Sequence, residues 1–131
     1  MIEHIKRLHT ILFVNDQELS RNFYQGIFRQ PADLDVPGMT EFILNDNCRI
    51  GLMPNRGITQ ILGNKILNPD SGNGIPRCEL YFYVDDIQLE FDNAVKNGAK
   101  LISPIDERNW GDTACYFADP DGHIFAFAKK I

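Results

Sequence analysis

The chain has 131 residues, of which 44% are hydrophobic and 24% are charged, and this balance is typical of one globular domain that can bury a core. The formal net charge is −5, and the Lys and Arg residues form no cluster in the sequence, which argues against a nucleic-acid surface. No apolar run has the length of a membrane-spanning helix, and residues 1–10 lack the apolar core of a signal peptide, so we expect a cytoplasmic protein without membrane contact.

A strand over residues 8–14 is the first element that the sequence predicts, and a helix follows it directly. Asn15 and Glu18 stand where an N-cap residue and its N3 partner could satisfy free backbone N–H groups. The helix has an apolar face and ends before Pro31, because proline disfavours a helical conformation in the preceding residue. Two short strands are then expected, over residues 41–44 and 48–53.

Residues 54–77 are rich in Asn, Gly and Pro, and they contain one short segment, residues 59–67, with a helical pattern. A connection of this length in a compact domain is typical of a lid, a binding loop or a subunit contact. A partly disordered linker is the alternative.

The second half begins with a strand over residues 79–84, whose aromatic and β-branched residues suit a half-buried sheet. Asp85 and Gln88 are placed to cap the following helix, and Asn97-Gly98 is a helix stop. Strands are expected over residues 100–103, 113–118 and 124–129, with a loop over residues 104–112. The last two strands are joined by the strong turn sequence of residues 119–122, Asp-Pro-Asp-Gly.

The two halves repeat each other at an offset of seventy residues. Val14 corresponds to Val84 and Asp16 to Asp86, and the strand positions and expected caps fall in the same register. An internal repeat of this kind predicts duplicated structural units. The sequence therefore predicts an α+β fold of two βαβββ modules in one domain, residues 1–131, with module one at 5–54, a linker at 55–77 and module two at 78–131.

Two such modules resemble the vicinal oxygen chelate superfamily, which includes glyoxalase I, bleomycin-resistance proteins, fosfomycin-resistance thiol transferases and extradiol dioxygenases. The resemblance covers nearly the whole chain, and the final run into Asp-Pro-Asp-Gly-His is its most specific part. It is carried by His9, Val14 and Asp16, by Phe23-Tyr24, by residues 80–86, by Gly98-Ala99 and Trp110-Gly111, and by residues 116–123. The resemblance implies one curved mixed sheet around a cleft.

Members of this superfamily place metal ligands on inward-facing strand positions, and the resemblance carries these positions over to His9, Gly51, Glu79 and Ala126. Gly51 and Ala126 have no side chain that can donate an electron pair, and a catalytic metal needs about three protein ligands. We therefore expect either no metal or a divalent Ni, Zn, Mn or Fe ion held weakly by His9 and Glu79. Glu41 on a neighbouring strand is a further side chain that could reach inward.

Strand alternation indicates which side chains line the cleft. If His9 and Glu79 face inward, so do Phe13, Tyr81 and Tyr83. Together with Trp110 from the following loop, these aromatic residues are typical of a small-molecule site. Packing in an ordinary core is the alternative for such residues.

Three functions fit these observations. The first is a binding protein, similar to bleomycin-resistance proteins, that holds a small aromatic or amphipathic molecule among Phe13, Tyr81, Tyr83 and Trp110. The second is a lyase or thiol transferase similar to glyoxalase I, with a metal on His9 and Glu79, or with Glu79 as a general base. The third is a purely structural or regulatory module that uses residues 54–77 as its partner surface. The resemblance also implies a homodimer.

Overall fold

The structure is a computed structural model that describes residues 1–72 and 74–131. The chain forms two compact units; the second begins at Gly74 and also includes Gly26–Arg29. Each unit contains one four-stranded mixed sheet in the order β1-β4-β3-β2 or β5-β8-β7-β6. The predicted α+β fold with two βαβββ modules is therefore confirmed.

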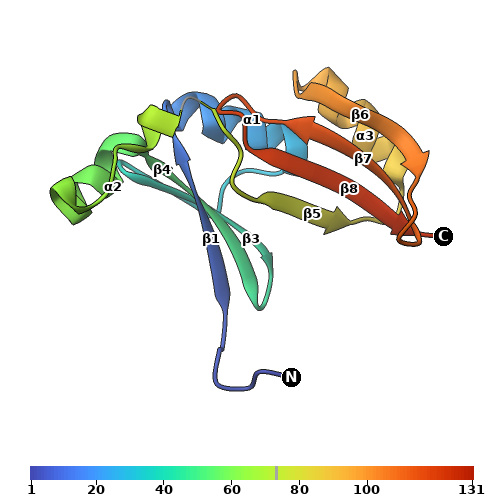
Figure 1. Ribbon diagram of the computed structural model, residues 1–131, viewed down its shortest axis with the longest axis horizontal. Helices are drawn as coiled ribbons and strands as arrows, with labels where there is room; N and C mark the ends of the chain where they lie inside the picture. Colours follow the sequence, from blue (N-terminus) through green and yellow to red (C-terminus); the bar gives the residue numbers. More distant parts are fainter. Residues whose placement is uncertain (73) are drawn as a thin grey trace. The chain divides into compact units, whose positions relative to one another are not determined.

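Module one contains five regular elements (Figure 1). They are β1 Leu8–Val14, α1 Gln17–Phe28, β2 Leu34–Val36, β3 Met39–Asn45 and β4 Cys48–Pro54. Strand β1 pairs in parallel with β4, and the other pairs are antiparallel. The register places His9 beside Arg49 and Ile11 beside Gly51, so these four side-chain positions share one face of the sheet.

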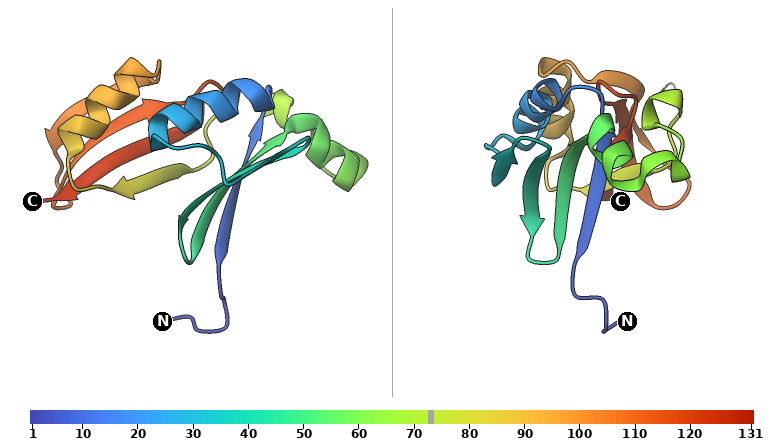
Figure 2. Two further views of the ribbon diagram at one scale, coloured as in Figure 1. Left: turned by 180° about the vertical axis from the view of Figure 1, so that it is seen from behind. Right: turned by 90° about the vertical axis from the view of Figure 1, so that its left-hand side faces the viewer.

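Module two repeats the same plan with β5 Glu79–Tyr83, α3 Ile87–Lys96, β6 Lys100–Glu107, β7 Asp112–Ala118 and β8 Ile124–Lys130. Figure 1 looks onto the face of this sheet that has no helix, and the reverse view in Figure 2 shows α3 in front of the strands. Phe91 of α3 packs on Phe117 of β7 with ring centroids 5.4 Å apart. Burial of Phe117, Phe125 and Phe127 under α3 forms the module's core.

The connecting segment contains α2 Asn55–Leu62 and the short 3₁₀ helices Gly63–Lys65 and Pro69–Gly72. The expected helical piece over residues 59–67 was therefore placed too late, since α2 begins directly after β4. Asn73 of the predicted linker lies outside the described residues. In the part of the chain that the structure describes, no helix is long and apolar enough to cross a membrane.

The helix caps differ from the prediction by one residue. Asp86 Oδ1 accepts the N–H of Leu89, and Asp16 Oδ1 accepts the N–H of Leu19, both at 3.0 Å. The caps predicted at Asp85 and Asn15 were wrong because both helices begin one residue later than expected. The true caps, Asp16 and Asp86, are themselves an identical pair of the seventy-residue repeat.

Strand β6 continues through Glu107, although the sequence predicted a loop from Pro104. Proline cannot donate to a sheet ladder and is tolerated on edge strands and at bulges, and the β6–β7 register shifts between Ser103 and Asp106. The Arg108 guanidinium donates to the carbonyls of Ala114 and Pro104 at 2.9 and 2.8 Å. The Arg108 side chain thus satisfies two carbonyl groups where the β6–β7 register is irregular.

Strand β2 was also missed and was read as part of a loop. It has only three residues and pairs with β3 alone. Contacts distant in sequence hold it in place, including the Arg21–Asp35 ion pair at 2.9 Å.

Candidate functional site

The helix-free face of the module-two sheet is the strongest candidate site. Residues in register point to the same side of a sheet, and the register places Tyr81 beside Ala126 and Ala126 beside Tyr116. We call this surface the site face; it carries Glu79, Tyr81 and Tyr83 of β5, Asp112, Ala114 and Tyr116 of β7, and Ala126, Ala128 and Lys130 of β8. Its three alanines are buried. The tyrosines of β5 and β7 therefore flank a central surface of small side chains.

Asp112 organises the polar part of the site face. It is only 2% exposed, and its Oδ2 atom accepts the hydroxyl groups of Tyr81 and Tyr83, each at 2.8 Å. The indole Nε1 of Trp110 donates to the Tyr81 hydroxyl oxygen at 3.0 Å. We call Tyr81, Tyr83, Trp110 and Asp112 the aromatic cluster. Its rings are fixed by hydrogen bonds to one another and to a single carboxylate.

These contacts shift the pKa values of Asp112 and Tyr81 in opposite directions. The Tyr81 hydroxyl, and after it that of Tyr83, hold the pKa of the Asp112 carboxyl below its ordinary value, against the effect of desolvation. Ionised Asp112 therefore stabilises the fold above pH 3.8, and this contribution is lost as the pH falls below that value. Burial, and then the hydrogen bond to Asp112, raise the pKa of Tyr81 to about 12, against the Trp110 hydrogen bond.

We expect Tyr81 to lose its proton at a higher pH than an ordinary tyrosine. Its raised pKa favours the neutral phenol, so its contribution to stability is complete below pH 10 and is lost as the pH approaches about 12. A spectrophotometric tyrosinate titration should show a step near pH 12 that is missing in Tyr81→Phe. A Tyr81→Phe curve that overlays the wild-type curve through the whole of that step would contradict this assignment.

Lys130 adds a loosely held cation to the aromatic cluster. Its Nζ atom lies 5.0 Å from the centroid of the Tyr83 ring and 3.9 Å from Asp112 Oδ1. The Lys130 side chain is 79% exposed. The second distance is too long for a hydrogen bond, so Lys130 is attracted to the cluster without being fixed in it.

The positions expected to hold a metal do not supply enough donors. Ala126 offers no ligand atom, and a Cβ atom added to Gly51 would lie 3.1 Å from Met39 Sδ and 3.4 Å from Ile11 Cγ1. In module one, His9 is in register with the cationic Arg49, and Glu41 is paired with Arg49 at 3.7 Å. Glu41 is therefore engaged by a cation, and the residues at these positions do not fit a complete metal site.

A second group of possible metal ligands lies in the turn between β7 and β8. Single ligand atoms of Asp119, Asp121 and His123 lie within 4.8 Å of one another. Asp119 Oδ1 accepts the backbone N–H groups of Asp121 and His123, each at 2.9 Å. The turn geometry predicted from Asp-Pro-Asp-Gly accounts for this arrangement, with Gly122 at φ +87°.

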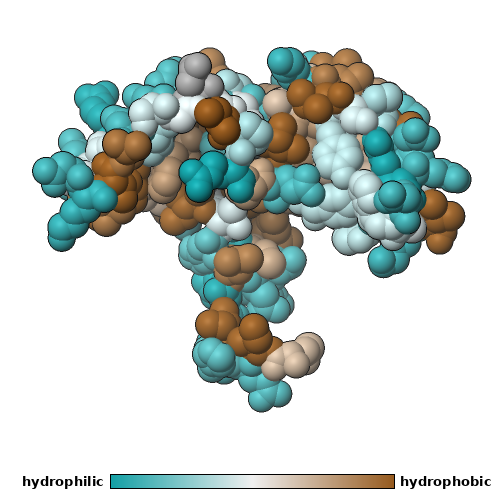
Figure 3. All heavy atoms as spheres, in the orientation of Figure 1, coloured by the Kyte–Doolittle hydropathy of each residue, from teal (hydrophilic) through white to brown (hydrophobic). Residues whose placement is uncertain are grey.

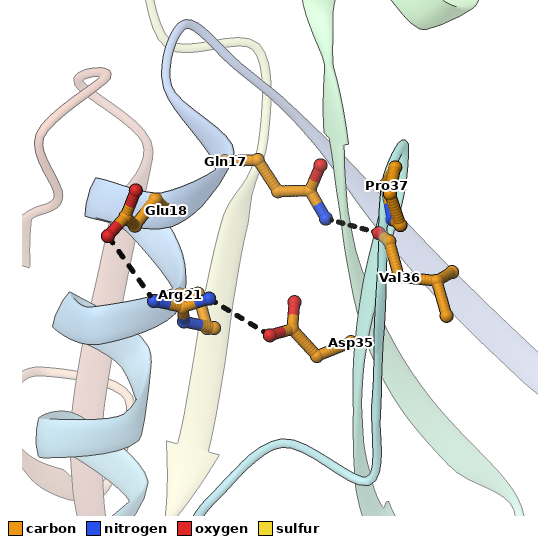
Figure 4. Close-up of a pocket in the computed structure, with 6 residues that line it drawn as sticks. All are labelled: Gln17, Glu18, Arg21, Asp35, Val36 and Pro37. Carbon is orange, nitrogen blue, oxygen red and sulfur yellow. Dashed lines mark hydrogen bonds and ion pairs between the residues drawn. The ribbon is translucent and has the colours of Figure 1, made fainter.

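Module one has a pocket of about 300 Å³ between the start of α1 and the β2–β3 hairpin (Figure 4). Arg21 in its wall pairs with Glu18 and Asp35 at 3.8 and 2.9 Å. Gln17 donates to the Val36 carbonyl at 2.8 Å. The Thr40 hydroxyl, and then Arg21, hold the pKa of Asp35 below its ordinary value. These polar groups already bind one another, so the pocket is explained as the attachment of the hairpin to α1.

The structure brings together three of the four aromatic residues expected to bind a ligand, namely Tyr81, Tyr83 and Trp110. Phe13 and His9 share a face of β1 in module one, and Glu79 is exposed at the start of β5. Sequence reasoning missed Asp112 and Lys130. The one available signal was that Asp112 follows Trp110-Gly111 and opens a strand.

Comparison with known proteins identifies relatives over almost the entire chain. A family model described as a glyoxalase-like domain matches residues 8–131. An uncharacterized protein of Mycobacterium bovis is 28% identical over 123 residues, which are 92% of this chain and 80% of that protein. An uncharacterized protein of Mycobacterium tuberculosis has the same identity, with 72% of its length covered.

Solved structures share the fold at lower identity. A glyoxalase-related enzyme from Fulvimarina pelagi has a TM-score of 0.78 at 22% identity, covering 93% of this chain and 86% of that chain. A glyoxalase/bleomycin resistance protein/dioxygenase family enzyme from Burkholderia phytofirmans has a TM-score of 0.75 at 18% identity, with coverages of 94% and 97%. These likenesses concern the fold, and the chemistry depends on the residues of the site face.

Proposed function

Because the chain belongs to the family of glyoxalase-like domains, we propose that it binds a small aromatic or amphipathic molecule on the site face of module two, without a full metal site. The binding groups are Tyr81, Tyr83 and Trp110, and Asp112 holds two of these rings in place. The sequence also predicted Phe13 of module one as a binding residue, and that role stays a prediction.

The observation that carries the proposal is that exposed aromatic rings are held rigidly. Tyr83 and Trp110 are 57% and 55% exposed, yet hydrogen bonds tie both into the aromatic cluster. The rings of Tyr81 and Tyr83 meet edge to face, with centroids 5.4 Å apart. Much of the surface over β5 and β8 in Figure 3 is pale, the intermediate hydropathy of tyrosine and tryptophan. Fixed amphipathic rings lose little conformational entropy when a ligand binds.

A metal-dependent lyase or thiol transferase is the alternative function. It requires donors that Gly51 and Ala126 do not have, which favours binding over metal-assisted catalysis. The roles of His9 and Glu79 as ligands, and of Glu79 as a general base, stay predictions, as do the homodimer and the cytoplasmic location.

The test uses Trp110, the only tryptophan, as a fluorescent reporter of the site face. Benzyl alcohol, a neutral aromatic probe, should change Trp110 emission with a Kd of roughly 1–10 mM, as suits a ligand of this size. Tyr83→Ala should weaken binding by about fivefold or more, since one wall of the site is lost.

Val95→Ala is the matched control, because Val95 is an exposed apolar residue on α3, away from the site face. It should leave the affinity for benzyl alcohol unchanged, and both variants should keep the wild-type circular dichroism spectrum. Equal affinities of wild type and Tyr83→Ala would place the binding site elsewhere.

A further inference from the structure

We propose that the ligand of the site face is an organic cation, an amine or quaternary ammonium with apolar substituents, and that the Lys130 ammonium occupies its place in the free protein. This inference rests on the proposed function and names the ligand class of the same site. It follows from the chemistry of the aromatic cluster, from the state of Lys130 and from the distribution of charge.

The aromatic cluster combines the two groups that recognise an ammonium ion. Rings of tyrosine and tryptophan attract a cation to their faces, most strongly when water is partly excluded. Asp112 supplies a buried carboxylate beneath Tyr81 and Tyr83, and both hydroxyl groups donate to it. Such donors favour the ionised carboxylate. A negative charge is therefore fixed at the base of the cluster, with ring surface beside it.

Lys130 shows that a cation is attracted to this place. Its ammonium lies over the Tyr83 ring at 5.0 Å, on the side of Asp112 Oδ1. Ion pairs of exposed lysines contribute little to stability, about 0–1 kcal/mol. A ligand cation can therefore displace the Lys130 ammonium into water at small cost, and Lys130 acts as a tethered competitor.

The other charges near the site face also favour a cation. Arg108 also adjoins this face, and its guanidinium is bound to the carbonyls of Pro104 and Ala114 and lies over the Tyr116 ring. Arg108 is therefore engaged between β6 and β7, and Lys130 would offer an anionic ligand a cation that stands beside the Asp112 carboxylate. The protein carries a net charge of −5, which attracts cations over distance.

The experiment compares three probes of similar size by Trp110 emission at low salt: benzyltrimethylammonium, benzyl alcohol and benzoate. We expect benzyltrimethylammonium to bind about tenfold more tightly than benzyl alcohol, and benzoate to bind most weakly. Added salt should weaken binding of the cation and leave that of the alcohol unchanged.

Lys130→Met separates this inference from the proposed function, because methionine keeps an apolar stem over Tyr83 and removes the charge. It should strengthen binding of benzyltrimethylammonium about three- to tenfold and change the affinity for benzyl alcohol less than twofold. Asp112→Asn should weaken binding of benzyltrimethylammonium about tenfold or more. A thermal melt would verify that this variant folds. Lys130→Glu, which leaves Asp112 intact, should raise the affinity for the cation further.

Each contrary outcome has a definite meaning. If benzyl alcohol binds and Lys130→Met leaves the affinity for benzyltrimethylammonium unchanged or lower, the cation inference is wrong and the proposed function stands. If benzoate binds most tightly and Lys130→Met weakens it, Lys130 is an anion anchor, and the inference is again overturned. If none of the three probes binds at about 20 mM, the proposed function fails as well.

Discussion

Replacing Phe117 with alanine should remove about 4 kcal/mol from the free energy of unfolding, the range observed when a buried phenylalanine is truncated. Phe117 is completely buried in β7. Its ring lies 5.4 Å from that of Phe91 on α3 and 5.7 Å from that of Phe125 on β8. The substitution leaves a cavity where the helix meets two strands, and neighbouring strands fixed in a ladder cannot close it.

Urea denaturation followed by circular dichroism would measure the loss, with Tyr116→Ala as the control. Tyr116 is the next residue in β7 and lies on the site face, half-buried under Arg108. Its truncation should cost less than about 2 kcal/mol, because water can occupy the vacated space. A greater loss in Tyr116→Ala than in Phe117→Ala would show that the core and the site face of this sheet have been assigned in reverse.

The alternation that separates Tyr116 from Phe117 was visible in the sequence, and so was most of the fold. The seventy-residue repeat predicted the two βαβββ modules, since strand, cap and apolar positions recur together. Two adjacent residues that can each cap a helix limited the precision at both helix starts. Asp85 and Asp86 are both good N-cap residues, and only the backbone shows that Asp86 caps α3.

The continuation of β6 past Pro104 was missed for a different reason. Local rules predict that proline ends a strand, but the Arg108 side chain satisfies the carbonyls of Pro104 and Ala114. Tertiary contacts of this kind override propensity. No pattern in the residues around Pro104 predicts that the Arg108 guanidinium donates to these two carbonyl groups.

The candidate site shows the same limit. Alternation predicted that Tyr81 and Tyr83 share a face, and a loop tryptophan was a reasonable neighbour. Asp112 is 29 residues from Tyr83 in the chain, and it meets the tyrosine hydroxyls because β8 pairs with both β5 and β7. The carboxylate at the centre of the site follows from sheet register, which a single sequence does not specify in advance.

Two helix glycines should respond in opposite directions to alanine. In an isolated helix, alanine is favoured over glycine by about 1 kcal/mol. At Gly26, near the end of α1, an added Cβ atom would lie 2.6 Å from Asn97 Cγ and 3.3 Å from Asn97 Cβ. Asn97 cannot move freely, because its Nδ2 atom donates to the Asn93 carbonyl at 2.8 Å. Asn93 in turn donates to the Gly26 carbonyl at 3.0 Å.

We therefore expect Gly26→Ala to lower the free energy of unfolding by about 2 kcal/mol, since overpacking and disturbed hydrogen bonds outweigh helix propensity. Gly57→Ala in α2 is the matched control: its Cβ atom would lie 3.3 Å from Met53 Cγ and 3.8 Å from Met53 Sδ, and a flexible methionine can yield. That variant should gain about 0.5–1 kcal/mol. Urea midpoints of both variants, measured against wild type, test the sign directly. A gain in Gly26→Ala would mean that α1 does not approach α3 closely at this glycine.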